Sequence, residues 1–379
     1  MGGSRFKRQA YEDEMFTTWK NLKVLYEFDE SLSKRAKSAF RKAARLWTNF
    51  TCINITEIGG DDGDVEEDEE GEQFYFYEYG NGVGGYEGNY GEESDEDSDD
   101  EDEDVDDEYS SIKVHGGYGC RSYDGKLRLT NWQQNITLGR KCETIGTAAH
   151  ELAHALGFVH TQQRHDRDKY ITVIFENIDV HRSQFETKSD KNNDNYGLPY
   201  DYGSVMHYGM TAGSANRTKP TLVPKDGLYN QTLGSLLISF YDLLMMNKHY
   251  NCTGFCKKED HDKCKNHGFA HPRNCSQCLC PSGYGGDFCD RRAPNGLHVE
   301  VRLTKLPANV SKEGCIYGGV EVKALADQGL TGYRFCSEGD VNTTLISNTS
   351  TLPVLTYMRR RRNDTAVELE YRIANENSE

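Results

Sequence analysis

The feature that most constrains this chain is a group of histidines within one short apolar segment. Residues 147–160 read TAAHELAHALGFVH, so His150 and His154 are four residues apart and His160 follows six residues later. Positions i and i+4 of a helix share one face, so both imidazoles would project to the same side. Gly157 can adopt the left-handed conformation that ends a helix, and the turn would bring His160 back to the same point.

Three imidazoles that meet at one point are typical of a zinc site. Histidine nitrogens bind Zn²⁺ at about 2.0–2.1 Å, and a site with three protein ligands keeps a position open, as catalytic sites do. Glu151 follows the first histidine and would face the same opening, where it could accept a proton from an attacking water. The simpler alternative, two unrelated histidines on a solvated helix face, explains neither Gly157 nor His160. We therefore predict a zinc peptidase site.

A second motif, S-V-M-H-Y at residues 204–208, has the form of the methionine turn that is the next element of metzincins. With it, the sequence resembles the astacin family of zinc endopeptidases from about Ala10 to Cys252, with one interruption. The resemblance implies an α+β catalytic domain, at residues 9–253, with two subdomains and an active-site cleft. The motifs that carry it are H-E-x-x-H-x-x-G-F-x-H at 150–160, Arg164, D-R-D at 166–168 and S-x-M-H-Y at 204–208.

The family resemblance also implies a role for each residue of the site. His150, His154 and His160 would hold one catalytic Zn²⁺, and Glu151 would be the general base. Tyr208 would be an additional zinc ligand in the resting enzyme and would swing away to stabilise the oxyanion during turnover.

Two further positions bear on the resemblance. Met206 would form an apolar floor beneath the metal, a role compatible with an ordinary packed methionine. Thr161 departs from the family pattern, because most astacins have there a glutamate that receives the new N-terminus after propeptide removal. A neutral hydroxyl cannot form that ion pair, so the usual link between activation and a buried N-terminus is in question here.

Cysteine content and glycosylation sequons indicate the compartment. The chain has 12 cysteines and eleven N-x-S/T sequons, which favour an oxidising, glycosylating environment and hence secretion. Residues 1–8 lack the apolar region of a signal peptide, and we expect a truncated N-terminus. Arg5-Phe-Lys-Arg8 is predicted as the remainder of a propeptide with a basic processing site, or else an ordinary basic linker. No run of 18 apolar residues occurs, so we expect no membrane-spanning helix.

The negative charge is confined to one segment. The net charge is −17, but residues 61–108 hold 25 acidic and no basic residues, which leaves 44 basic against 36 acidic residues elsewhere. We expect residues 59–109 to be a disordered insertion, solvated or else able to bind calcium, steer basic substrates or inhibit the cleft. No basic face surrounds the catalytic motifs, so nucleic acid is not expected as a partner.

Two smaller modules are predicted after the catalytic domain. Six cysteines within residues 254–290 indicate an EGF-like module stapled by disulfides, with a zinc cluster as the alternative. Residues 294–379 are rich in strand-like segments and resemble a short or divergent CUB domain, a β-sandwich. Family resemblance implies the pairs Cys52–Cys252, Cys120–Cys142, Cys256–Cys275, Cys264–Cys278, Cys280–Cys289 and Cys315–Cys336.

Periodicity gives a coarse secondary structure. A strand is expected at residues 21–28, and apolar residues at three- and four-residue steps predict a helix from Asp29 to Trp47. Further strands are expected from Cys52 and within residues 111–137, and a closing helix at residues 236–249.

The sequence thus predicts a secreted zinc endopeptidase. Its implied substrates are extracellular proteins of the matrix, cuticle or egg-coat class, and the two modules could add matrix partners. The rival interpretation is a non-enzymatic matrix-binding protein with an inactive protease domain. A calcium-buffering acidic protein is a third possibility, which leaves the two zinc motifs unexplained.

Overall fold

The computed structural model describes residues 8–11, 16–59, 110–127, 133–189, 193–215, 217–282, 284–290, 298–349, 351–359 and 366–373. The predicted processing site at residues 1–8 lies outside these ranges except for Arg8, as do the acidic insertion beyond Gly59 and residues 360–365. Within the described residues, no helix is long and apolar enough to cross a membrane.

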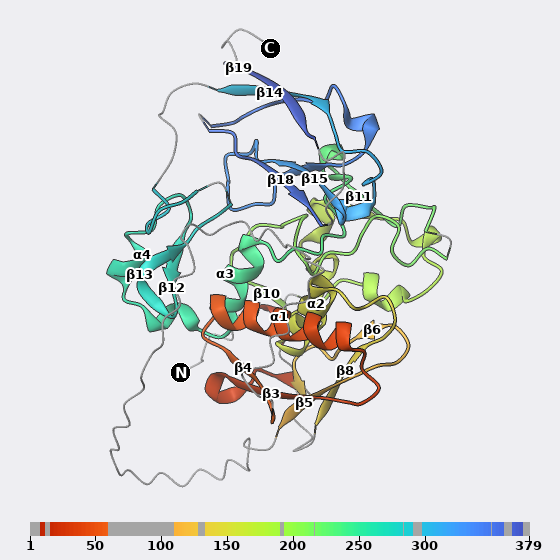
Figure 1. Ribbon diagram of the computed structural model, residues 1–379, viewed down its shortest axis with the longest axis vertical. Helices are drawn as coiled ribbons and strands as arrows, with labels where there is room; N and C mark the ends of the chain where they lie inside the picture. Colours follow the sequence, from red (N-terminus) through yellow and green to blue (C-terminus); the bar gives the residue numbers. More distant parts are fainter. Residues whose placement is uncertain are drawn as a thin grey trace.

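The N-terminal part is a mixed five-stranded sheet covered by two helices (Figure 1). Its strands lie in the order β4-β3-β5-β8-β6; the first four are parallel, and β6 is an antiparallel edge strand. Buried aromatic residues join the sheet to α1, since the rings of Tyr26 and Phe40 lie 4.9 Å apart, centroid to centroid. The two helices also contact each other, because the indole nitrogen of Trp47 donates to the carbonyl of Ala149 at 3.1 Å. The elements are β3 (Lys23–Phe28), α1 (Lys34–Phe50), β4 (Asn54–Glu57), β5 (Ser111–His115), β6 (Cys120–Arg121), β8 (Gln134–Leu138) and α2 (Ile145–Ala155).

Two predicted helix starts were wrong. Helix α1 begins at Lys34 rather than Asp29, because the Asp29 carboxylate accepts hydrogen bonds from the backbone and hydroxyl of Ser31 and so stabilises a turn. The closing helix α3 (Phe240–His249) begins after residue 239 rather than at 236, because Ser239 and Asp242 form a reciprocal capping box there.

The chain between α2 and α3 has little regular structure. It consists mainly of loops, short 3₁₀ helices and short two-stranded ladders, which pair β9 with β11 and β10 with β1. A further two-stranded ladder, β2 with β7, belongs to the chain before α2. The strands of these ladders are β1 (Arg8–Tyr11), β2 (Phe16–Thr17), β7 (Lys126–Leu127), β9 (Ile171–Val173), β10 (Asn193–Asn195) and β11 (Leu222–Pro224). The 3₁₀ helices between α2 and α3 are η3 (Thr161–Gln163), η4 (Arg167–Lys169), η5 (Phe175–Asn177), η6 (Arg182–Phe185) and η7 (Gly227–Tyr229).

A disulfide-rich segment follows α3. It contains η8 (Cys252–Phe255), α4 (Lys258–His261) and the hairpin β12 (Phe269–His271) and β13 (Asn274–Leu279). Arg273 at the hairpin turn donates to the carbonyls of Thr48 and Thr51 at the end of α1, at 2.7 and 2.8 Å. The hairpin is thereby fixed against the N-terminal part.

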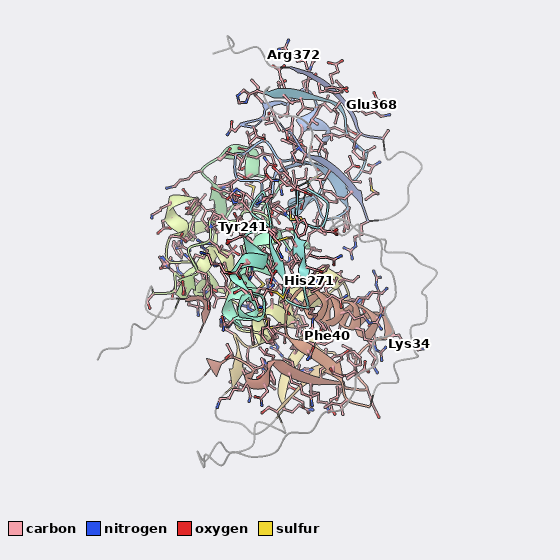
Figure 2. The ribbon with its side chains drawn as sticks, turned by 90° about the vertical axis from the view of Figure 1, so that its left-hand side faces the viewer. Lys34, Phe40, Tyr241, His271, Glu368 and Arg372 are labelled. Carbon is pink, nitrogen blue, oxygen red and sulfur yellow. A yellow bond between two sulfur atoms is a disulfide. The ribbon has the colours of Figure 1, made fainter. Side chains whose placement is uncertain are left out.

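The C-terminal residues form two three-stranded sheets, β17-β14-β19 and β16-β15-β18, whose buried residues belong to one apolar cluster. These sheets stand at one end of the molecule, and α1 lies toward the other (Figures 1 and 2). The strands are β14 (Val299–Lys305), β15 (Gly318–Val322), β16 (Tyr333–Phe335), β17 (Thr344–Ile346), β18 (Val354–Met358) and β19 (Glu368–Ile373).

All twelve cysteines are paired, so the described chain contains no free thiol. The six disulfides have the same pairing that the family resemblance implied. They are Cys52–Cys252, Cys120–Cys142, Cys256–Cys275, Cys264–Cys278, Cys280–Cys289 and Cys315–Cys336.

Candidate metal centre

Helix α2 carries the first two histidines on one face. Thr144 caps its start by accepting the N–H of Thr147, and small residues let it pack closely on α1. At its end, Phe158 N–H bonds to Ala153 O at 2.9 Å while Gly157 has a φ of +105°. A Cβ at Gly157 would lie 2.7 Å from a ring nitrogen of His249. The left-handed turn and this close approach both require glycine, and the turn leads directly to His160.

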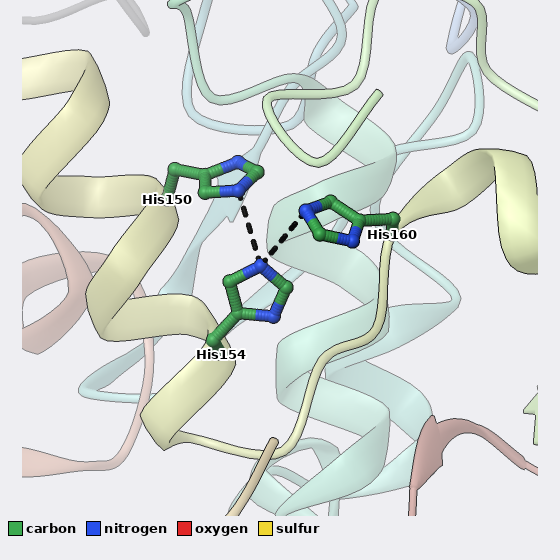
Figure 3. A group of neighbouring side chains, drawn as sticks. All are labelled: His150, His154 and His160. Carbon is green, nitrogen blue, oxygen red and sulfur yellow. Dashed lines mark hydrogen bonds between the residues drawn. The ribbon is translucent and has the colours of Figure 1, made fainter. Parts of the chain in front are cut away.

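The three histidine side chains meet at one point. The Nε2 atom of His154 lies 3.1 Å from Nε2 of His150 and 3.1 Å from Nε2 of His160 (Figure 3). All three rings are largely shielded from solvent, and their candidate ligand atoms lie within 4.8 Å of one another. The structure therefore brings together the three residues that the motif predicted.

Hydrogen bonds on the far side of each ring decide which nitrogen faces the centre. His150 Nδ1 lies 2.7 Å from Val205 O, His154 Nδ1 2.8 Å from Phe158 O, and His160 Nδ1 3.1 Å from Gln184 Oε1. Backbone carbonyl oxygens can only accept, and Gln184 satisfies His160 with its amide oxygen. A neutral imidazole with its proton on Nδ1 presents a lone pair at Nε2, so three lone pairs converge.

Converging lone pairs fit a cation. Burial, and then the neighbouring His154, lowers the pKa of His150 to about 3, and the same causes hold the pKa of His160 well below its usual value. Burial opposes a charge on His154 as well, but hydrogen bonding to Asp124 raises its pKa overall. A proton on His154 Nε2 could serve only one of the two 3.1 Å contacts, whereas one metal ion satisfies all three nitrogens. The three histidines could therefore hold one zinc ion.

Glu151 and Tyr208 lie beside this cluster. Burial raises the pKa of Glu151 to about 7, as suits a carboxylate that exchanges a proton near neutral pH. The Tyr208 ring packs 4.2 Å, centroid to centroid, from the ring of His160. Burial and the charges of Glu151 and Asp124 raise the pKa of Tyr208, so its hydroxyl remains a hydrogen-bond donor.

The matching family model is that of astacin, a peptidase family, and it covers residues 11–78 and 101–251. The chain belongs to the astacin family. It is similar to zinc metalloproteinase nas-31 of Caenorhabditis elegans, with 37% identity over 97% of this chain and 58% of that protein. It is also similar to zinc metalloproteinase nas-36 of Brugia malayi, with 34% identity over 77% of this chain and 42% of that protein. The chain thus spans only about half the length of these two relatives.

Among solved structures, the chain resembles high choriolytic enzyme 1, a hatching-enzyme zinc protease from Oryzias latipes. The identity is 25%, the alignment covers 62% of this chain and 94% of the other, and the TM-score is 0.44.

In this astacin, the methionine turn holds two of the histidine-bearing segments through its backbone. Val205 O accepts from His150 Nδ1, and Met206 O accepts from Thr161 N–H at 3.0 Å. Met206 is fully buried in the same apolar cluster as α2. The role of Met206 as an apolar floor beneath the metal stays a prediction, whereas the backbone of its turn bonds directly to the histidine-bearing segments.

Thr161 is part of a buried polar network. Its hydroxyl donates to Ser204 Oγ at 3.0 Å, and Ser204 Oγ donates to Asp242 of α3 at 2.5 Å. Asp242 also accepts the N–H groups of Val205 and Ser239. The hydroxyl of Thr161 thus links the third histidine's segment to the methionine turn and to α3.

Sequence reasoning missed the residues that orient the histidines from outside. Phe158 and Val205 lie within the two motifs but contact the rings through backbone carbonyls, which every residue has, so their identity gives no signal. Gln163 and Gln184 lie outside both motifs. Asp124 was missed for the same reason. Its carboxylate lies 2.9 Å from His154 Nδ1, although 30 residues separate the two in sequence.

Proposed function

We propose that this chain is a secreted zinc endopeptidase that hydrolyses peptide bonds of extracellular proteins. The observation that carries the proposal is the convergence of three Nε2 lone pairs, with each Nδ1 facing an acceptor. Zinc bound there would polarise the scissile carbonyl. It would also lower the pKa of water, so that the water can lose a proton and act as a nucleophile near neutral pH.

Glu151 and Tyr208 have separate tasks in this mechanism. Glu151 accepts the proton of the attacking water and passes it to the leaving amine, a transfer for which a pKa of about 7 is well suited. Tyr208 donates a hydrogen bond from its hydroxyl to the oxyanion that develops at the substrate carbonyl and keeps its proton. The raised pKa of Tyr208 supports this role, because a phenolate could not donate.

The six disulfides and the sequons support secretion, since such frameworks persist in oxidising compartments. We further propose that residues 254–290 are an EGF-like module and residues 294–379 a divergent CUB-like domain. The first two disulfides of residues 254–290 interleave and the third follows them, and this pattern and the two three-stranded sheets of the C-terminal residues support these assignments. Both could recruit partners in the matrix, cuticle or egg coat, which we propose as the substrate class.

The test is cleavage of a generic protein substrate by the purified chain, with and without a zinc chelator. We expect cleavage that is lost on chelation, restored by zinc, and abolished by Glu151→Ala. The control is Glu143→Gln, which changes a carboxylate that accepts a hydrogen bond from the Ser33 hydroxyl at the start of α1.

Cleavage that survives both chelation and Glu151→Ala would contradict the proposal. If the folded, zinc-loaded chain does not cleave, deletion of residues 60–108 separates two explanations. Activity gained on deletion would identify the acidic segment as an inhibitor. Continued inactivity, together with binding to matrix proteins, would favour the rival function as a matrix-binding protein.

A further inference from the structure

Asp124 belongs to a turn that is docked on the last turn of α2. The N–H of Gly125 donates to the carbonyl of His154 at 2.7 Å, and Gln134 of β8 donates to the carbonyl of Gly125 at 3.2 Å. Gly125 has a φ of +107°, a conformation that favours glycine. Backbone contacts on both sides therefore fix the position of Asp124 relative to His154.

The Asp124 carboxylate joins the two sides of the metal centre. One oxygen lies 2.9 Å from His154 Nδ1, and the other lies 3.9 Å from Lys188 Nζ. Lys188 belongs to the segment after η6, where its N–H donates to Gln163 O, and the Gln163 side chain lies 3.3 Å from His160 Nδ1. Asp124 therefore contacts His154 directly and is connected to His160 through Lys188 and Gln163.

His154 differs from the other two histidines in its surroundings. The Nδ1 partners of His150 and His160 described above are neutral oxygens, whereas His154 Nδ1 faces both a carbonyl and a carboxylate. A carboxylate that accepts from a histidine ligand fixes the ring's tautomer and makes the opposite nitrogen a stronger donor to a metal. Three neutral imidazoles also leave a divalent charge uncompensated in a shielded site, so a nearby negative charge stabilises the bound ion.

We propose that Asp124 is a positioning residue of the metal centre, which locks His154 with Nε2 toward the ion and supplies part of the compensating negative charge. This inference rests on the proposed function, because it requires that the three histidines bind zinc. It assigns Asp124 a role in metal affinity through His154, without contact between Asp124 and the reacting atoms.

The test compares the full chain with Asp124→Asn and Asp124→Leu. Zinc affinity is measured by competition with a chromophoric chelator, and the ligand field by the visible absorption of the cobalt-substituted protein. We expect Asp124→Leu to weaken zinc binding by about 10–100-fold and to shift the cobalt bands. Asp124→Asn should cause a smaller loss, because an amide oxygen can still accept from Nδ1 without supplying charge.

Asp29→Asn is the matched control. Asp29 also pairs with a lysine, Lys113, at 3.2 Å, and its side chain is 34% exposed against 30% for Asp124. The control should bind zinc as the unmodified chain does. Thermal unfolding of each metal-free variant shows whether a loss of affinity merely follows a loss of folding.

The outcomes separate this inference from the proposed function. An unmodified chain that binds no zinc overturns both. Zinc binding by the unmodified chain and by both Asp124 variants with equal affinity overturns only the role of Asp124. The role is likewise overturned if Asp124→Leu loses affinity only in proportion to its metal-free unfolding temperature, with unchanged cobalt bands.

Discussion

The two parts of the chain that meet at the metal centre are stabilised in different ways. The N-terminal part has a regular sheet, two helices and its own apolar cluster, to which α3 also contributes. The segment between α2 and α3 has mostly short 3₁₀ helices and loops. Its buried residues, among them Phe185, Tyr200 and Tyr229, share one cluster with Val301, Val320 and Tyr333 of the C-terminal sheets. The second part therefore completes its core with residues from the end of the chain.

The residues of the C-terminal part also pack closely against the backbone of the segment between α2 and α3. A Cβ on Gly203, near the methionine turn, would lie 2.2 Å from the Thr331 side chain, and a Cβ on Gly314 would lie 2.2 Å from Gly234 O. Glu313 accepts hydrogen bonds from the N–H and hydroxyl of Thr211, three residues after Tyr208. The C-terminal sheets are thus packed against the polypeptide that carries the methionine turn, and their removal would expose the core of the second part.

The largest expected effect comes from breaking this contact at Arg334. Arg334 forms a buried ion pair with Glu321 at 2.9 Å and donates to Ser235 across the contact. Arg334→Leu removes the guanidinium that pairs with the buried Glu321 carboxylate, so we expect the free energy of unfolding to fall by about 3–5 kcal/mol. Denaturant unfolding measures it.

Arg372→Leu is the control, because Arg372 pairs with Glu300 but its side chain is 73% exposed. That change should cost less than about 1 kcal/mol. Equal effects of the two substitutions would show that the contact with the C-terminal sheets contributes little to stability.

The second prediction concerns pH at the junction of the two parts. Burial, and then the nearby Asp201, raises the pKa of Asp242 to about 6, above its unfolded value. Folding therefore favours the protonated form of the Asp242 carboxyl, and the folded protein loses stability when this carboxyl ionises. Stability from this group is fully present below about pH 4 and is lost as pH rises through about 6, a change of about 3 kcal/mol.

The comparison is between the unmodified chain and Asp242→Asn, both metal-free, unfolded with denaturant at pH values from about 4 to about 7, the range over which the group titrates. The advantage of the unmodified chain should shrink as pH rises, because asparagine does not ionise. A difference that stays constant with pH would show that Asp242 is not protonated in the folded protein at the low end of the range.

A smaller effect is expected from a single hydrogen bond across the contact. Thr331 donates through both its N–H and its hydroxyl to the buried carboxylate of Asp201. Thr331→Val removes the hydroxyl alone, so we expect a loss of about 1–3 kcal/mol in unfolding free energy. Thr344→Val, at an exposed position of β17, should change stability little; equal losses at both positions would argue against the bond.

The smallest effect is expected in the N-terminal part. Arg41 and Glu57 form a bidentate pair at 2.7 and 2.9 Å near the surface. Arg41→Gln should cost about 0–1 kcal/mol in denaturant unfolding, because solvent screens such pairs. A loss as large as that of Arg334→Leu would show that the surface pair of the N-terminal part contributes as much to stability as the buried pair at the contact with the C-terminal sheets.

The metal ligands could be predicted because their spacing is local. His150 and His154 lie one helical turn apart, and Gly157 brings in His160 through a turn that the sequence itself specifies. The helix starts were misplaced because local side-chain hydrogen bonds outweighed the apolar periodicity. These are the Asp29–Ser31 turn before the Ser33 cap of α1 and the capping box at Ser239 of α3. Asp124 and the contact with the C-terminal sheets were not predictable, since both depend on residues that meet only in the tertiary fold.

The disulfide between Cys52 and Cys252 determines whether a cut in the acidic segment can be detected by gel electrophoresis. Strands β4 and β5, which precede and follow the acidic segment, both pair with β3 and so belong to one sheet. A single cut between residues 60 and 109 would leave Cys52 on one fragment and Cys252 on the other. The two-chain product would therefore migrate as one species on a non-reducing gel, and only a reducing agent would reveal that the backbone had been broken.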